Sequence, residues 1–177
     1  MGVHDGSFDI YDRGVAASPE LKRLGEDGAV GPLAGAFATS GAGEDATVFG
    51  PDIPPIRPGE TSSVAFLVEV ERGRAEYFSY ASMVVPSNDA FVGNGNPTAH
   101  RIFNNGGKFI PTSFVVTGAE VLDVGTEVND EVPGNTAALA RAAPNTGDTE
   151  GGTVALHQGF DENGNILAAR EKHEPCI

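Results

Sequence analysis

The stretch of residues 79–96, SYASMVVPSNDAFVGNGN, constrains the fold of this chain most. It begins with an apolar run that ends in β-branched residues, which is typical of a strand. Pro86 ends that strand, because proline cannot donate a hydrogen bond to a sheet. The polar loop Ser87-Asn88-Asp89 then lies between the apolar pairs Val84-Val85 and Phe91-Val92. Such an oxygen-rich loop suits a hard cation such as calcium, and the alternative is a turn whose Asn and Asp bond their own backbone.

A second polar stretch favours the cation. Residues 123–131, DVGTEVNDE, follow the apolar run 114–116 and place four carboxylates and one carboxamide within nine residues. Four like charges this close repel one another unless solvent or a cation lies between them. The two stretches together therefore indicate a candidate calcium site built from loops.

These two stretches also resemble a known family. SMVVPSNDAFVGN and DVGTEVNDEVPG are similar to the bacterial branch of the spondin N-terminal domain, whose animal members carry Ser-Pro-Asp-Trp-Phe-Val-Gly and Asp-Ala-Gly-Thr-Asp. The opening, VHDGSFDIYDRGVAASPELKRLGEDG, is similar to the bacterial members as well, so the resemblance covers about residues 3–170. It implies a C2-like arrangement of two sheets and a role in adhesion or matrix assembly.

The resemblance also implies a set of calcium ligands. Asp89 and Asp123 match the acidic positions of the two motifs, and Glu127 matches a position where animal members carry aspartate. Asn129 and Asp130 are neighbours that could complete the shell. Two departures leave the ligand set open: Ala90 replaces the tryptophan of the animal motif, and glutamate is longer than aspartate.

Composition narrows the class of protein. The 177 residues fit one domain, residues 1–177, and 24 glycines, 12 prolines and no tryptophan favour an all-β chain with many turns. The net charge of −14 argues against a nucleic-acid partner and against unaided docking on anionic lipid. No apolar run approaches the length of a membrane span, so we expect no direct membrane insertion. The single cysteine, Cys176, cannot form an intrachain disulfide, and it is either free or paired with another chain.

The N-terminus, MGVHDGSF, has no basic region and no hydrophobic segment, and therefore no signal peptide. The chain is then either cytosolic or the mature form of a longer protein. The spondin resemblance favours the second alternative, a secreted or cell-surface protein.

The pattern along the chain predicts an antiparallel β-sandwich with one short N-terminal helix. That helix is expected over Pro19–Asp27, with Ser18 as its N-cap and with Gly25 and Gly28 ending it. A weaker helical piece covers residues 32–38. The expected strands are 3–12, 47–49, 61–71, 77–85, 108–117, 153–158 and 166–169. The expected turns are 72–74, 104–107 and Asn163-Gly164, with a flexible loop at 146–152.

Other chemistries find weaker support. Asp161-Glu162-Asn163-Gly164-Asn165 begins like an EF-hand loop but lacks glycine at the sixth position and glutamate at the twelfth. None of the four histidines (His4, His100, His157 and His173) has a partner at zinc spacing, and we expect them to be structural. No Gly-x-Ser-x-Gly motif or dinucleotide loop appears. Carboxylates of residues 123–131 could serve glycoside cleavage, but no tryptophan is present to stack a sugar.

The sequence therefore predicts a non-enzymatic, extracellular, calcium-binding β-sandwich for adhesion or matrix interaction. Its partner would be an extracellular protein or glycan, or a second copy of the chain. One alternative is a self-assembling subunit of an extracellular filament or matrix, joined by strand addition at a sheet edge. A carbohydrate-active enzyme is the weakest alternative.

Overall fold

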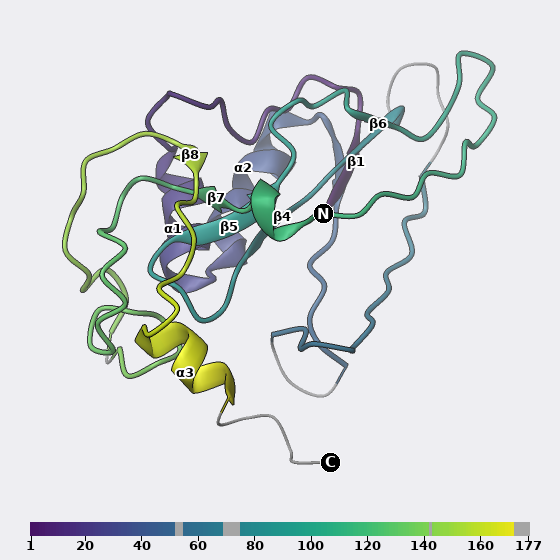
Figure 1. The fold of residues 1–177 in the computed structure, drawn as a ribbon. Coiled ribbons are helices and arrows are strands. Elements are labelled where there is room, and N and C mark those ends of the chain that lie inside the picture. Colours follow the sequence, from purple (N-terminus) through teal and green to yellow (C-terminus); the bar gives the residue numbers. More distant parts are fainter. Residues whose placement is uncertain (52–54, 69–74, 142, 172–177) are drawn as a thin grey trace. The chain divides into compact units, whose positions relative to one another are not determined.

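The computed structural model describes residues 1–51, 55–68, 75–141 and 143–171 (Figure 1). The chain forms two compact units, each with one four-stranded antiparallel sheet. Unit 1 consists of Met1–Ile10, Val30–Ala81 and Gly93–Val115. Unit 2 consists of Tyr11–Ala29, Ser82–Val92 and Val116–Ile177.

Sheet A belongs to unit 1 and has the strand order β2-β1-β3-β6. Its strands are β1 (Gly2–His4), β2 (Gly43–Asp45), β3 (Tyr77–Ser79) and β6 (His100–Arg101). The helix α2 (Val30–Ser40) covers β1 through the buried ring of Phe37. A Cβ atom added to Gly2 would lie 2.9 Å from that ring, so β1 needs glycine at this position.

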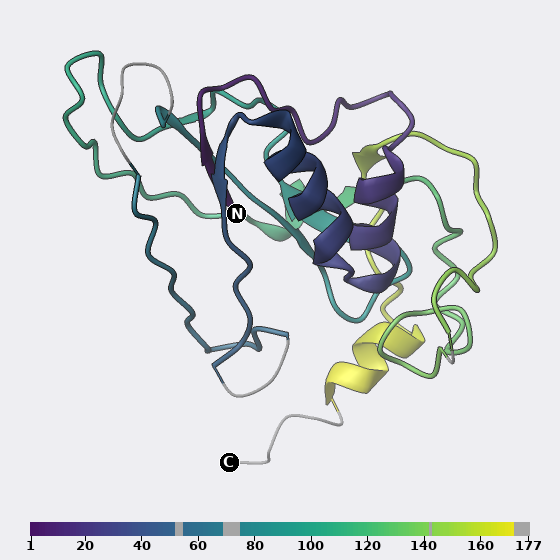
Figure 2. The same cartoon turned by 180° about the vertical axis from the view of Figure 1, so that it is seen from behind.

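Sheet B belongs to unit 2, apart from the end residues Ala81 and Gly93, and has the order β4-β5-β7-β8. Its strands are β4 (Ala81–Met83), β5 (Ala90–Gly93), β7 (Leu122–Asp123) and β8 (Ala155–Leu156). The helix α1 (Pro19–Asp27), purple in Figure 2, packs closely on the segment that follows β7. A Cβ atom added to Gly25 would lie only 2.4 Å from the side chain of Val124. The core of this unit contains Leu21, Leu24, Phe91, Leu122, Val124, Val154 and Ile166.

The helix expected at Pro19–Asp27 is confirmed with both of its ends. Ser18 Oγ accepts a hydrogen bond from Leu21 N at 3.1 Å, and Pro19 occupies the first turn, where its missing N–H costs nothing. Gly28 ends the helix in the left-handed conformation, with φ of 66°. The expectation that Gly25 also ends it is wrong, because Gly25 lies inside α1. The second helical piece is also confirmed, although α2 is longer than the expected range of 32–38.

The strand expected at 166–169 is wrong, and so is its expected pairing with residues 153–158 as a hairpin around Asn163-Gly164. Residues 166–169 belong to the helix α3 (Asn165–Glu171). The buried carboxylate of Glu131 accepts hydrogen bonds from Asp161 N at 2.7 Å and from Ile166 N at 3.2 Å. A distant carboxylate therefore holds the first turn of α3, which local turn chemistry does not predict. With α1, α2, α3 and the 3-10 turn η1 (Gly118–Glu120), the described part of the chain also has more helix than expected.

Several expected strands are shortened or displaced. The range 3–12 is a strand only in β1, and the range 153–158 only in β8. The range 77–85 is divided between β3 and β4, which belong to different sheets. The edge strand expected at 47–49 is wrong, because the edge strand of sheet A is β2 at Gly43–Asp45. In the loop expected at 146–152, Thr149 forms an isolated bridge with Glu127.

The two most β-prone stretches are not strands. Residues 61–68 form none, and residues 69–71 with the expected turn at 72–74 lie outside the described residues. In the range 108–117 only Phe109 pairs, as an isolated bridge with Phe103. Propensity alone does not make a strand, because a ladder also needs a neighbouring chain segment. The turn between Phe103 and Phe109 is confirmed, with Asn104 Oδ1 accepting hydrogen bonds from Gly106 N and Lys108 N.

Within the described ranges, no helix has the length and apolar character needed to cross a membrane. Cys176 and His173 lie outside these ranges.

Candidate cation site

Asp89 is the most deeply buried of the expected ligands, with no exposed surface. It lies in the loop between β4 and β5, which is closed by a hydrogen bond from Val84 N to Ala90 O at 2.8 Å and by one from Ala90 N to Ser87 Oγ at 3.1 Å. Its Oδ2 atom accepts hydrogen bonds from Thr126 N at 2.8 Å and Glu127 N at 3.0 Å. Its Oδ1 atom is buried and has no hydrogen-bond partner among the described residues.

Asp123 lies beside this loop at the end of β7, where it pairs with Ala90 in the register of sheet B. Its Oδ1 atom accepts a hydrogen bond from Gly125 N at 2.5 Å, and its Oδ2 atom accepts one from the Asn129 amide. Burial and, second to it, the charge of Asp123 raise the pKa of Asp89 to about 7, while the Thr126 and Glu127 hydrogen bonds oppose the shift. The structure therefore brings these two carboxylates close enough to repel each other.

Asn129 connects Asp123 to a histidine. Its Oδ1 atom lies 3.3 Å from His157 Nε2. Burial lowers the pKa of His157, while the charges of Asp123 and Glu131 raise it. The amide nitrogen of Asn129 therefore faces Asp123 and its oxygen faces His157, a residue for which the sequence predicts only a structural role.

Glu127 was expected to be a calcium ligand, but its side chain forms an ion pair within the chain. Its backbone N–H contacts Asp89, but its side chain pairs with Arg141, and its Oε1 atom also accepts a hydrogen bond from Gly147 N at 3.2 Å. Burial and the charge of Glu26 raise the pKa of Glu127 to about 7, against the lowering effect of Arg141. Its Oε2 atom is buried and, within the described chain, has no hydrogen-bond partner.

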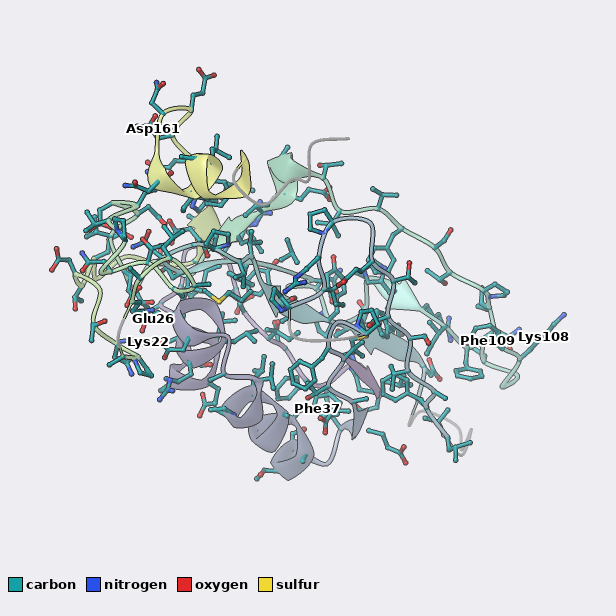
Figure 3. The ribbon with its side chains drawn as sticks, turned by 90° about the horizontal axis from the view of Figure 1, so that it is seen from below. Lys22, Glu26, Phe37, Lys108, Phe109 and Asp161 are labelled. Carbon is teal, nitrogen blue, oxygen red and sulfur yellow. The ribbon has the colours of Figure 1, made fainter. Side chains whose placement is uncertain are left out.

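Arg141 joins Glu127 to the end of α1. It is buried, and its Nη1 atom donates to Glu26 O at 2.6 Å and lies 3.4 Å from Asp27 Oδ1. Both carboxylate oxygens of Glu26 are buried without a hydrogen-bond partner in the described residues, and Lys22 Nζ lies 3.5 Å from Oε1. Figure 3 labels Lys22 and Glu26, which both belong to α1. The sequence gives no signal for this buried charge cluster, because Arg141 lies more than a hundred residues from α1.

Asp130 organises the following turn, and its carboxylate accepts its hydrogen bonds from residues other than the two calcium-site loops' Asp89 and Asp123. Its Oδ1 atom accepts hydrogen bonds from Asn88 Nδ2 at 3.1 Å and Val132 N at 2.9 Å. Its Oδ2 atom accepts one from Asn135 Nδ2 at 2.7 Å. Both oxygens of Asp130 therefore already have donors.

Glu150 is an acid near the site that the sequence did not single out. Burial and the charge of Asp123 raise its pKa, although its side chain is exposed. The sequence signal that could have identified Glu150 is the pair of acidic residues in the stretch TGDTEGG, residues 146–152. Asp161, by contrast, lies in the loop before α3 at the periphery of Figure 3, and its Oδ1 atom accepts the ordinary turn hydrogen bond from Asn163 N at 2.8 Å.

Unit 1 contains a different polar cluster, in which His4 Nε2 lies 2.8 Å from Ser79 Oγ. This pair resembles a nucleophile with its base. However, His4 Nδ1 accepts a hydrogen bond from Gly6 N at 3.0 Å, which places the proton of the neutral ring on Nε2. His4 then donates to Ser79 and cannot remove its hydroxyl proton, so the pair lacks the geometry of a catalytic dyad.

In the part of the chain that the structure describes, no group of three or more His, Cys, Asp or Glu side chains is arranged to hold one metal ion. Comparisons with protein-family models, curated proteins and solved structures gave no match to this chain.

Proposed function

We propose that this chain is an extracellular calcium-binding module for adhesion or matrix interaction. The observation that carries the proposal is the unpartnered Oδ1 atom of Asp89, buried beside the negative charge of Asp123. A buried carboxylate oxygen without a donor is unfavourable, and a cation or a proton relieves it. Calcium accepts such oxygens without requiring a donor hydrogen.

The donor chemistry fits a hard cation. Asp89 would supply its unpartnered Oδ1 atom, and Asp123 would supply a carboxylate oxygen that already accepts a hydrogen bond from Gly125 N or Asn129. The Asn129 amide oxygen would join by leaving His157, and water and backbone carbonyls would complete the six to eight ligands that calcium takes. The bound ion would neutralise the repulsion between Asp89 and Asp123 and would tie the loop before β5 to the segment after β7. Glu127 and Asp130 would join only by leaving Arg141 and Asn135, with which they already pair.

The resemblance to spondins supports the remaining parts of the proposal. These are secretion or cell-surface attachment, an extracellular protein or glycan as partner, and the face-to-face packing of the two sheets as a C2-like sandwich. Long-range nuclear Overhauser contacts between side chains of the two sheets would test that packing, and their absence would contradict it.

Calorimetric titration of calcium into chelator-treated protein tests the binding. We expect a saturable site with a dissociation constant of about 0.1–1 mM, as in other extracellular modules. Asp123→Asn should abolish binding, because it removes one of two carboxylates. Asp161→Asn is the matched control, since it removes the same charge from a loop that is not part of the site. Equal loss from both variants would indicate diffuse attraction to an acidic surface and would refute the site.

The proposed role in attachment needs a separate test. Asp123→Asn should reduce binding of the chain to matrix or cells along with its calcium affinity. A folded Asp123→Asn chain that loses calcium and still attaches normally would show that the ion is only a structural staple.

A further inference from the structure

Residues 63–68 of unit 1, SVAFLV, form an exposed segment without backbone pairing. Among the described residues, none of their backbone N–H or carbonyl groups has a hydrogen-bond partner. Figures 1 and 2 draw this stretch as an open trace without a strand arrow. Leu67 is 90% exposed, more than any other large apolar side chain of the described chain. Another molecule can therefore reach this backbone without any prior opening of the fold.

Free backbone and an exposed side chain are what an endoprotease requires of a folded substrate. Such an enzyme binds the residues around the bond it cuts as an extended strand, through their N–H and carbonyl groups, and places one side chain in its primary pocket. Helices and paired strands must first unfold locally, whereas residues 63–68 already meet both conditions. Phe66 and Leu67 would supply the side chain, which calls for an enzyme with a large apolar pocket.

Two other exposed aromatic side chains are held in place. Phe109 is 56% exposed, but it forms a bridge with Phe103 and their ring centroids lie 5.5 Å apart. Phe114 is 43% exposed, but its ring stacks on that of His100 with centroids 4.1 Å apart. Both would have to give up these contacts before a protease could bind them.

Phe49 and Leu156 are also exposed and are also less suited to cleavage. A protease holds the carbonyl oxygen of the bond it cuts as that oxygen becomes negative, but Phe49 O already accepts a hydrogen bond from Ser62 Oγ. Leu156 lies in β8, which pairs with β7. The first cut is therefore expected within residues 63–68.

We propose that residues 63–68 are a proteolytic processing site, cut after Phe66 or Leu67 by an endoprotease with an apolar primary pocket, and that both fragments stay together as one folded particle. The step is hydrolysis of one peptide bond. Water supplies the hydroxyl group of the new carboxylic acid and the proton of the new amine, so no other reactant is needed.

Unit 1 contains chain from both sides of the cut. The strand β1 lies on the N-terminal side and pairs with β3 on the C-terminal side, in the register Gly2 with Ser79 and Val3 with Phe78. A buried side-chain contact adds to this ladder, because His4 Nε2 lies 2.8 Å from Ser79 Oγ. The cut leaves these contacts in place.

Unit 2 is also built from both sides of the cut. The helix α1 lies on the N-terminal side, and its Glu26 carbonyl oxygen accepts a hydrogen bond from Arg141 Nη1 at 2.6 Å. Gly14 N donates to Val154 O at 2.9 Å, and Val154 N donates to Val15 O at 3.0 Å. Cleavage makes these contacts intermolecular without removing them, so we expect the fragments to stay bound.

Limited digestion of the full chain with a trace of chymotrypsin, read by intact-mass spectrometry, tests the site. We expect the first products to be residues 1–66 with 67–177, or 1–67 with 68–177. Native size-exclusion chromatography should return both fragments at the elution volume of the uncut chain, and urea should separate them. A first cut outside residues 63–68 would overturn the site. Fragments that elute separately in native buffer would overturn their retention.

Leu67→Pro tests both bonds with one substitution. Chymotrypsin does not cut on either side of this proline, so the cut in residues 63–68 should be lost. Leu67 N has no hydrogen-bond partner among the described residues, so the fold should be kept, and an unchanged urea midpoint checks this. Val115→Pro is the matched control at a position that is 82% exposed, and it should leave the first cut unchanged. Equal digestion of Leu67→Pro and wild type would refute the proposal.

The cleavage site and the calcium site can fail separately. Asp89 and Asp123 both lie on the C-terminal side of the cut and belong to unit 2, so chymotrypsin should make the same first cut with calcium and with chelator. The nicked particle should bind calcium as the uncut chain does. A chain that is cut as expected but binds no calcium would refute the calcium site alone.

Discussion

Two buried polar networks of this protein are satisfied to different degrees. In unit 1, His4, Ser79 and Asn94 are neutral and bond one another, with Asn94 Nδ2 donating to Ser79 Oγ at 2.9 Å and to Asn96 O at 3.0 Å. In unit 2, buried oxygens of Glu26, Asp89 and Glu127 have no hydrogen-bond partner in the described residues. Neutral groups can satisfy one another inside a chain, whereas clustered carboxylates need protons or cations from elsewhere. Unit 2 should therefore respond to ions, and the His4 network should not.

The largest expected effect comes from removing the internal cation of unit 2. Arg141→Met leaves the buried carboxylate of Glu127 without a cationic partner and leaves Asp27 with Arg23 alone, and we expect a loss of about 3–5 kcal/mol in the free energy of unfolding. Urea denaturation measures it. Arg101→Met is the control, because the Arg101–Glu76 pair in unit 1 is partly exposed and should contribute about 1 kcal/mol or less. Similar losses from both variants would contradict the importance of burial.

Calcium should stabilise unit 2 to a smaller extent. At a concentration one hundred times its dissociation constant, the ion adds about 2.7 kcal/mol to the free energy of unfolding. This corresponds to an increase of about 5–11 °C in the melting temperature of a chain of this size. Scanning calorimetry with calcium and with chelator measures it. An unchanged melting temperature, after the metal is shown to have left, would argue against the site.

The neutral network should lose stability without gaining any dependence on ions. Ser79→Ala removes the oxygen shared by His4 and Asn94, and we expect a loss of about 1–3 kcal/mol, equal with calcium and with chelator. Ser82→Ala, at an exposed position in β4, should change stability by about 0.5 kcal/mol or less. A calcium-dependent loss from Ser79→Ala would break the distinction between the two networks.

The smallest expected effect is the pH response of Asp89. Its pKa is raised from 3.8 to about 7, so the folded chain holds a proton that the unfolded chain has released, and the stability this proton provides is lost as the pH rises through about 7. Without calcium, the wild type should lose about 1 kcal/mol relative to Asp89→Asn between pH 6.5 and 8. The comparison cancels the histidines, which both chains share. Urea denaturation at the two pH values measures it, and saturating calcium should abolish the difference by replacing the proton.

The candidate site was predictable in part. The sequence singled out both polar loops, and hydrogen bonds connect Asp89 with Glu127 N and Asp123 with the Asn129 amide. The partner of Glu127 was not predictable, because Arg141 and the end of α1 reach it only through the fold. Charge patterns show where acidic residues cluster in the sequence. They do not show which buried basic side chain pairs with those residues.

The sequence by itself determined the features whose causes lie within a few residues. Both ends of α1 are determined by Ser18, Pro19 and Gly28, and the turn at residues 104–107 is determined by Asn104. Capping and turn hydrogen bonds are local, so the sequence shows them. The tertiary structure decided the rest. Residues 61–68 lack a strand because no neighbouring segment of the described chain pairs with them, and residues 165–171 are helical with the carboxylate of Glu131 on their first turn. Strand pairing and buried charge compensation depend on segments distant in sequence, so the fold alone settles them.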